Sequence, residues 1–256
     1  MDLHLSKKIF IITGGAKGIG RATCELLSSE GAYPVIVDKD EVAGHELASK
    51  LPNSYFIPVD LGSKDACRIA VEDTFAKYGR LDGIVNNAGR NDGVGLEKGT
   101  PERFLASMES NVGHFYYMVH YALSHLKKSK GSVVNIASKV ALTGQGNTSG
   151  YAAAKGAVLA LTREWAVELL PHSIRVNAVL PAEVWTPLYE SWISTFSNPQ
   201  EKKKQIEGKI PLEKRMTTPQ EIADTVVFLL SDRASHVTGQ WLSVDGGYLN
   251  LDRSIS

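Results

Sequence analysis

The chain has 256 residues, 43% of them hydrophobic, which is enough to bury a core without a metal or disulfide staple. Its 28 basic and 28 acidic residues balance to a formal charge of zero, so the bulk charge favours neither nucleic acid nor an anionic membrane as a partner. Two cysteines, Cys24 and Cys67, exclude a disulfide scaffold and lack metal-ligand spacing, so we expect no metal site. With no signal peptide and no apolar run of about 18 residues, the sequence predicts a soluble, cytoplasmic protein.

Short apolar, β-branched runs alternate with longer helical patterns along the chain. Continuous rather than alternating hydrophobicity is typical of parallel strands that are covered on both faces. The sequence therefore predicts one doubly wound, Rossmann-like α/β domain over residues 1–256. The predicted strands are Ile9–Thr13, Tyr33–Asp38, Tyr55–Asp60, Gly83–Asn86, Ser132–Ala137, Ile174–Leu180 and Trp241–Val244.

Capping residues mark the predicted helix boundaries. Gly31 is a C-terminal stop for the first helix, and Ser63 is an N-cap for the third. Thr100-Pro101 and Thr218-Pro219 each place a capping threonine before a proline at the first helical position. Residues 182–212 contain three prolines, four aromatic residues and no strand pattern, which predicts a helical insertion that covers a substrate.

A glycine-rich loop, Thr13–Gly20, follows the first predicted strand and opens a helix. Glycines there let the backbone turn tightly and approach a pyrophosphate at the helix N-terminus. A tight turn without a ligand is the alternative. The predicted cofactor contacts in this loop are Gly14, Lys17, Gly18, Ile19 and Gly20.

Asp38 ends the second predicted strand. A carboxylate at that position can hydrogen-bond the ribose hydroxyls of adenosine and repel a 2′-phosphate, which favours NAD over NADP. Lys17 keeps NADP open as an alternative, because a lysine in the glycine loop could bind a 2′-phosphate, and Lys39 could help it. A simple acid at the end of a surface strand is the other interpretation of Asp38.

Two further strand ends carry cofactor candidates. Asp60-Leu61 ends the third strand, where an aspartate can reach the adenine amino group, although it could also cap a turn. Asn87, Ala88 and Gly89 follow the fourth strand, and small residues there allow close approach of a cofactor. We expect Asn86 to be structural and Asn87 to lie nearer the cofactor.

Tyr151 and Lys155 share one face of a predicted helix. A free tyrosine has a pKa of about 10, and lowering it to about 7 takes about 4 kcal/mol. One cation about 5 Å away supplies roughly 3 kcal/mol at an effective dielectric of about 20. An oxidised nicotinamide would add a second positive charge, so we expect Lys155 and this charge together to bring the pKa of Tyr151 into the range of a general base. A surface helix pair is the alternative.

Ser138 follows the fifth strand, and Asn111 lies inside the helix that starts near Thr100. A buried asparagine there could instead satisfy backbone groups. Together with the preceding motifs, these residues resemble the compact form of the short-chain dehydrogenase/reductase family, and the resemblance covers essentially the whole chain. The matching motifs are Thr13–Gly20, Asn86–Gly89, Asn111, Ser138, Tyr151-x-x-x-Lys155, Arg175–Val179 and Val244–Gly247.

The resemblance implies a role for each matching position. Tyr151 would be the general acid/base, and Lys155 would lower its pKa and hold the nicotinamide ribose. Ser138 would orient the reacting oxygen, and Asn111 would hold a water in a proton relay to Lys155.

For the segment after the sixth strand, the resemblance implies that Thr186 and the backbone of Val184 contact the nicotinamide carboxamide. This segment also departs from the family pattern. Many members have Pro-Gly where this chain has Pro181-Ala182, followed by Glu183.

Polar and aromatic side chains follow the strand ends on the expected substrate side. Donors and acceptors beside aromatic rings suit a small polyhydroxylated ligand. Alternatively, the aromatic residues pack the insertion at residues 182–212, called the lid below, against the sheet, and the acids cap loops. The candidate substrate residues are Asp92, Gln145, Asn147, Glu183, Trp185 and Tyr189.

Three longer strings, residues 144–151, 161–167 and 181–189, resemble bacterial L-fucose dehydrogenases of this family. The resemblance implies an NAD-dependent sugar dehydrogenase that oxidises the anomeric C1 hydroxyl of a free aldose to a 1,5-lactone. It also implies a homotetramer, paired through the helices around Asn111 and Tyr151. A reductase or dehydrogenase of another small alcohol or of a 3-oxoacyl substrate is the alternative, followed by a catalytically silent NAD-binding protein.

Overall fold

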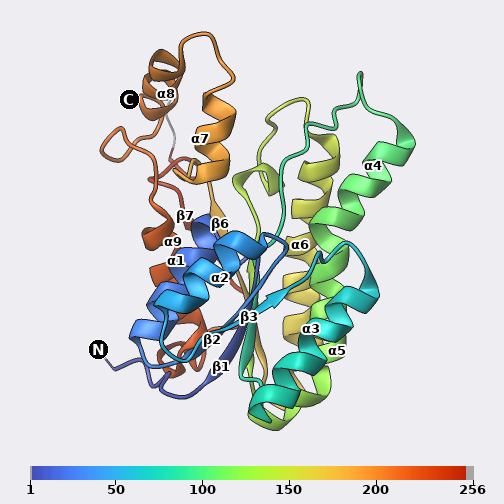
Figure 1. Cartoon of the computed structure of the whole chain (residues 1–256). Coiled ribbons are helices and arrows are strands. Elements are labelled where there is room, and N and C mark those ends of the chain that lie inside the picture. The colour runs from blue at the N-terminus through green and yellow to red at the C-terminus, as the bar shows by residue number, and fades with distance from the viewer. Residues whose placement is uncertain (1, 252–256) are drawn as a thin grey trace.

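The computed structural model describes residues 2–251 and contains a seven-stranded sheet (Figure 1). The strand order is β3-β2-β1-β4-β5-β6-β7, and every neighbouring pair is parallel. This confirms the predicted doubly wound α/β fold. The strands are β1 (Ile9–Thr13), β2 (Tyr33–Asp38), β3 (Tyr55–Pro58), β4 (Gly83–Asn86), β5 (Ser132–Ile136), β6 (Arg175–Pro181) and β7 (Trp241–Val244).

Helices cover both faces of the sheet (Figure 1). One face packs against α1 (Gly18–Ser29), α2 (Glu41–Lys50) and α9 (Pro219–Leu230). The other packs against α3 (Lys64–Tyr78), α5 (His114–Ser129) and α6 (Ser149–Glu168), with α4 (Pro101–Met108) beside α6. Two short helices, α7 (Pro187–Ile193) and α8 (Pro199–Glu207), occupy most of residues 187–207. Within residues 2–251, no helix combines the length and apolarity needed to cross a membrane.

The continuous hydrophobicity of the strands follows from this double covering. Successive residues of a strand point to opposite faces. In β1, Ile11 joins the core under α3, α5 and α6, whereas its neighbour Ile12 joins the core under α1, α2 and α9. Ile84 and Val85 of β4 divide in the same way.

The predicted caps are confirmed, and the strand ends differ by a residue or two. Ser63 Oγ accepts a hydrogen bond from the backbone N of Ala66 at 3.2 Å, and Thr218 forms a capping box with Glu221. The largest difference is in β3, which ends at Pro58 rather than Asp60. Backbone pairing still continues one step further, because Val59 N donates to Asp38 O at 3.0 Å.

A chain of buried polar side chains connects the centre of the sheet to α6. Asn86 Nδ2 of β4 donates to Asn135 Oδ1 of β5 at 2.9 Å, and Asn135 Nδ2 donates to Thr162 Oγ1 of α6 at 3.0 Å. All three residues are fully buried. As expected, Asn86 makes a structural contact. These hydrogen bonds fix the position of α6, the helix that carries Tyr151 and Lys155.

Replacing Thr162 with valine keeps the shape of the side chain and leaves Asn135 Nδ2 without its acceptor. We expect Thr162→Val to lower the free energy of unfolding by about 1–3 kcal/mol, because a buried donor is left unpaired. Urea unfolding of the cofactor-free protein measures the change. Thr195→Val, at an exposed position, is the control and should change little. Equal losses in the two variants would contradict the role given to the buried chain.

Candidate active site

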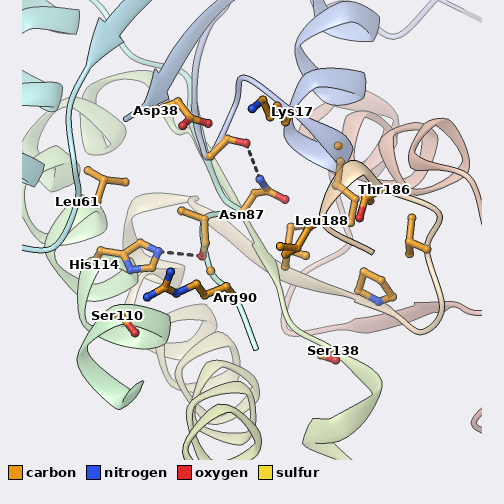
Figure 2. A pocket seen from close by; sticks show the side chains of 18 of the residues that line it. Lys17, Asp38, Leu61, Asn87, Arg90, Ser110, His114, Ser138, Thr186 and Leu188 are labelled. Atoms are coloured by element: carbon orange, nitrogen blue, oxygen red, sulfur yellow. Dashed lines mark hydrogen bonds between the residues drawn. The ribbon is translucent and has the colours of Figure 1, made fainter. Parts of the chain in front are cut away.

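A cavity of about 780 Å³ lies beyond the carboxyl ends of the parallel strands (Figure 2). Its walls come from the segments that follow β1 to β6, and β1 and β4 meet at the point where the strand order reverses. Ligands of doubly wound sheets bind at such a switch point. In Figure 2, Lys17 and Asp38 lie at one end of the cavity and Ser138 lies at the other.

The glycine loop turns sharply after β1. Gly14 and Gly18 have φ angles of +61° and +55°, which favour glycine. A Cβ at Gly14 would lie 3.0 Å from Ala88 Cα, and one at Gly20 would lie 2.1 Å from Gly14 O. Glycine is therefore required both for the turn and for its close packing on the segment after β4. Of the predicted cofactor residues, all of which lie within the described chain, only Gly20 does not line the cavity.

Side-chain hydrogen bonds join the ends of β1 and β4. Asn87 Nδ2 donates to Thr13 O at 2.9 Å and to Gly14 O at 3.0 Å. Thr13 Oγ1 also accepts from the backbone N of Asn87 at 2.9 Å and of Ala88 at 3.1 Å. The segment after β4 therefore holds the glycine loop in place.

Charged side chains gather at the Asp38 end. Asp38 accepts hydrogen bonds at 3.0 Å from the backbone N of Ala16 and from that of Asp40, so its carboxylate is held on both oxygens. Lys17 Nζ lies 2.5 Å from Asp40 Oδ2. Lys39 Nζ lies 3.4 Å from Asp60 Oδ2. Both lysines that could have bound a 2′-phosphate are therefore paired with acids.

Ser138, Tyr151 and Lys155 line the opposite end of the cavity. Lys155 Nζ donates to the backbone O of Ile136 at 2.7 Å and lies 5.7 Å from the centre of the Tyr151 ring. Tyr151, Lys155 and Ser138 come from two elements, α6 and the segment after β5. The sequence spacing placed them together correctly.

Without the charge of an oxidised nicotinamide, the expected lowering of the Tyr151 pKa does not occur. Burial raises the pKa of Tyr151, and the opposing hydrogen bond with Ser138 does not outweigh it. Burial also lowers the pKa of Lys155 to about 7, so this lysine loses much of the charge that was expected to act on the phenol. Sequence spacing gives the separation of the two groups but not the loss of water around them.

Asn111 lies in a π-helical turn, Glu109–Gly113, which interrupts the single helix expected from Thr100 onward. Its Oδ1 accepts from the backbone N of Arg90 at 2.8 Å, and its Nδ2 donates to Ser107 O at 3.0 Å. A Cβ at Gly89 would lie 3.0 Å from Asn111 Oδ1 and 3.5 Å from Lys155 Nζ, so both side chains approach the same side of Gly89. π-Turns of this kind are frequent at functional sites.

The cavity residues that the sequence did not reveal include Arg90, Ser110 and His114. The ring Nε2 of His114 lies 3.1 Å from Ala88 O (Figure 2). Burial and the charge of Lys155 lower the pKa of His114 to about 4, so the neutral ring donates this hydrogen bond. Their positions in the sequence could have indicated them, because Ser110 and His114 lie close to Asn111 and Arg90 directly follows Gly89.

A buried ion pair anchors the base of the lid. Glu183 accepts from Lys139 Nζ on one oxygen and from the Tyr189 hydroxyl, at 2.5 Å, on the other. Lys139 Nζ also lies 4.2 Å from the centre of the Tyr248 ring. The segment after β5, the segment after β6 and α7 are therefore tied together. Lys139 was missed, although it directly follows Ser138.

Tyr189 lines the cavity, but the other five predicted substrate residues, all within residues 2–251, do not. Trp185 packs with the apolar cluster of the lid, and Lys203 Nζ lies 4.2 Å from its ring centre. Asp92 Oδ1 accepts from Ser107 Oγ at 3.0 Å. Gln145 and Asn147 are exposed.

The buried lysine gives a prediction for the pH dependence of stability. Unfolding returns the pKa of Lys155 from about 7 to its ordinary 10.5, so between these values the unfolded chain binds a proton that the folded chain lacks. This residue therefore makes the free energy of unfolding rise with pH by up to about 1.4 kcal/mol per unit. We expect the cofactor-free protein to show this rise between pH 7 and pH 9, relative to Lys155→Met. Parallel urea-unfolding profiles for the two proteins would contradict it.

Sequence comparisons identify relatives over nearly the full chain. A family model described as "Enoyl-(Acyl carrier protein) reductase" matches residues 14–249. The L-fucose dehydrogenase of Mus musculus is 38% identical over 245 residues, which cover 94% of this chain and 88% of that protein. The 3-oxoacyl-[acyl-carrier-protein] reductase FabG of Thermotoga maritima is 33% identical over 253 residues, 96% of this chain and 99% of that one.

Solved structures share the fold over the same length. Cj0485 dehydrogenase superimposes with a TM-score of 0.96 and 44% identity, covering 100% of this chain and 99% of that one. Ligand-free aldohexose dehydrogenase of Thermoplasma acidophilum has a TM-score of 0.91 and 29% identity, with coverage of 100% and 99%. The 3-ketoacyl-(acyl-carrier-protein) reductase of Brucella melitensis, in complex with NADH, has a TM-score of 0.86 and 30% identity, with coverage of 95% and 99%.

Proposed function

Because the chain belongs to the short-chain dehydrogenase/reductase family of oxidoreductases, we propose that it oxidises the anomeric C1 hydroxyl of a free aldose. The proposed substrate is L-fucose or a stereochemical relative, the cofactor is NAD, and the product is the 1,5-lactone. The observation that carries this proposal is a single cavity with Asp38 and the glycine loop at one end and Ser138, Tyr151 and Lys155 at the other. The names of the sugar dehydrogenase relatives support the substrate class.

The residues at the Asp38 end fit a nicotinamide dinucleotide. The backbone at Gly14 leaves no room for a Cβ beside Ala88, as expected where a loop must stay thin for a pyrophosphate. Asp38 would hold the adenosine ribose, Asp60-Leu61 the adenine, Lys155 the nicotinamide ribose, and Thr186 with the backbone of Val184 the carboxamide. When bound, the nicotinamide accepts a hydride from the substrate carbon.

The other groups at the site would handle the proton. Tyr151 takes the proton of the C1 hydroxyl, and the Ser138 hydroxyl orients the reacting oxygen. A charged Lys155 favours the phenolate, because an adjacent cation offsets the penalty that burial places on it. Asn111 Oδ1 and Lys155 Nζ approach the same side of Gly89, and Asn111 would hold the water through which this lysine exchanges its proton.

Tyr189 is the proposed sugar platform. Its ring lines the cavity, and the hydrogen bond to Glu183 at 2.5 Å fixes its orientation. The C–H face of a pyranose packs well on such a ring, while its hydroxyls need polar partners. The second candidate, a 3-oxoacyl reductase, is favoured by the FabG relative and by the description of the family model.

Initial rates of nicotinamide reduction test the proposal. L-fucose, D-arabinose and L-galactose are compared with NAD and NADP in parallel, and a 3-oxoacyl thioester is assayed with NADH and NADPH. We expect turnover of at least one of the three aldoses with NAD. Turnover of the thioester alone, by protein shown to be folded, would replace the proposal with the reductase.

Removing the Tyr151 hydroxyl separates chemistry from binding. We expect Tyr151→Phe to lower kcat at least 10²-fold, the contribution of a general acid/base, with the NAD dissociation constant nearly unchanged. Steady-state rates and the quenching of protein fluorescence by NAD measure the two effects. Tyr116→Phe, at a tyrosine that is half exposed, is the control. Full activity in Tyr151→Phe would remove this residue from the proposed chemistry.

A further inference from the structure

Two lysines and two aspartates line the end of the cavity that would hold adenosine, and a third aspartate, Asp40, lies beside them. Lys17 pairs with Asp40 at 2.5 Å and Lys39 pairs with Asp60 at 3.4 Å, while Asp38 accepts hydrogen bonds from the backbone N of Ala16 and of Asp40. The five side chains therefore carry one net negative charge. In a site built to bind a 2′-phosphate, these lysines would be expected to face the ligand without an acid on each.

Asp40 is the residue that connects this group. Its Oδ1 caps α2 by accepting from Ala43 N at 3.0 Å, and its Oδ2 holds the Lys17 ammonium. Its backbone N donates to Asp38 Oδ1 at 3.0 Å. Asp40 therefore reaches the glycine loop through its side chain and the strand-end carboxylate through its backbone.

We propose that Asp40 is a cofactor-specificity residue, which excludes NADP by holding the Lys17 ammonium away from the 2′-phosphate position. The proposal rests on the proposed use of NAD and adds a second element to it. Asp38 acts by repelling the phosphate directly. Asp40 acts by withholding the one cation that the glycine loop offers.

The ion pair between Lys17 and Asp40 affects the binding of NADP and of NAD differently. A 2′-phosphate that recruits Lys17 must break its ion pair with Asp40 and leave the Asp40 carboxylate unpaired near the phosphate. A 2′-hydroxyl has no charge and leaves the pair intact. The pairing with Asp40 raises the pKa of Lys17 and lowers the pKa of Asp40, so both groups stay charged at neutral pH.

Asp40→Asn isolates this effect with little disturbance to the fold. Asparagine caps helices as well as aspartate does, so the start of α2 is retained. The bond to Asp38 comes from the backbone and is also retained. Only the charge that holds Lys17 is lost.

Calorimetric binding of NAD and NADP, without any sugar, tests the proposal in four variants. We expect Asp40→Asn to tighten NADP binding by about tenfold at low salt and to change NAD binding less than twofold. Adding Lys17→Met to Asp40→Asn should abolish the gain, and raising the salt concentration should reduce it. Lys17→Met alone should not tighten NADP binding and should weaken it, because it leaves the Asp40 carboxylate unpaired near the phosphate. Asp65→Asn, which removes an exposed charge on α3, is the control and should have no effect.

Unchanged NADP binding in Asp40→Asn would overturn the proposal, and so would a gain that survives in the double variant. Because no sugar is present, a wrong substrate assignment leaves the test intact. Equal binding of NAD and NADP by the unmodified protein would refute the proposed NAD preference. The ratio between Asp40→Asn and the double variant would still decide whether Asp40 withholds Lys17.

Discussion

The hydrogen bonds that Thr13 Oγ1 accepts from the backbone of Asn87 and Ala88 are the interaction on which the site depends. They join the ends of β1 and β4, the two strands from which the chain proceeds in opposite directions across the sheet. Asn87 Nδ2 then holds the carbonyl of Gly14, whose Cα leaves no room for a side chain. The path of the glycine loop, and with it the floor of the cavity, is set by the segment after β4 rather than by the loop alone.

Burial sets the chemistry at the end of the cavity that Ser138, Tyr151 and Lys155 line. Tyr151 and Lys155 are both withdrawn from water, which raises the pKa of the phenol and lowers that of the ammonium. Each group then needs a charged or polar neighbour more than it would at the surface. Phe115, whose ring centre lies 5.0 Å from Lys155 Nζ, and neutral His114 complete a setting in which one added positive charge has a large effect. A cationic ligand group at this end would therefore shift the balance between phenol and phenolate.

The strands, the caps and the cofactor side of the site could be predicted because they depend on local sequence. Apolar runs such as Ile9–Thr13 are buried on both faces, and polar residues directly after them must meet at one edge of a parallel sheet. The substrate side depends on which side chains pair across loops. Glu183 was expected to face the substrate, yet it is engaged by Lys139 and Tyr189. Likewise, Lys17 meets Asp40 only because the loops after β1 and β2 lie together, and the π-turn at Asn111 follows from no propensity of its residues.

The most direct measurement follows the hydrogen at the reacting carbon. L-fucose carrying deuterium at C1 is oxidised in the presence of NAD, and the reduced cofactor is analysed by mass spectrometry. Oxidation of the anomeric hydroxyl predicts that the deuterium appears in the reduced nicotinamide and that the product is the lactone. Reduced cofactor without deuterium would place the oxidation at another carbon, and no reduced cofactor with L-fucose or its relatives would contradict the sugar dehydrogenase account.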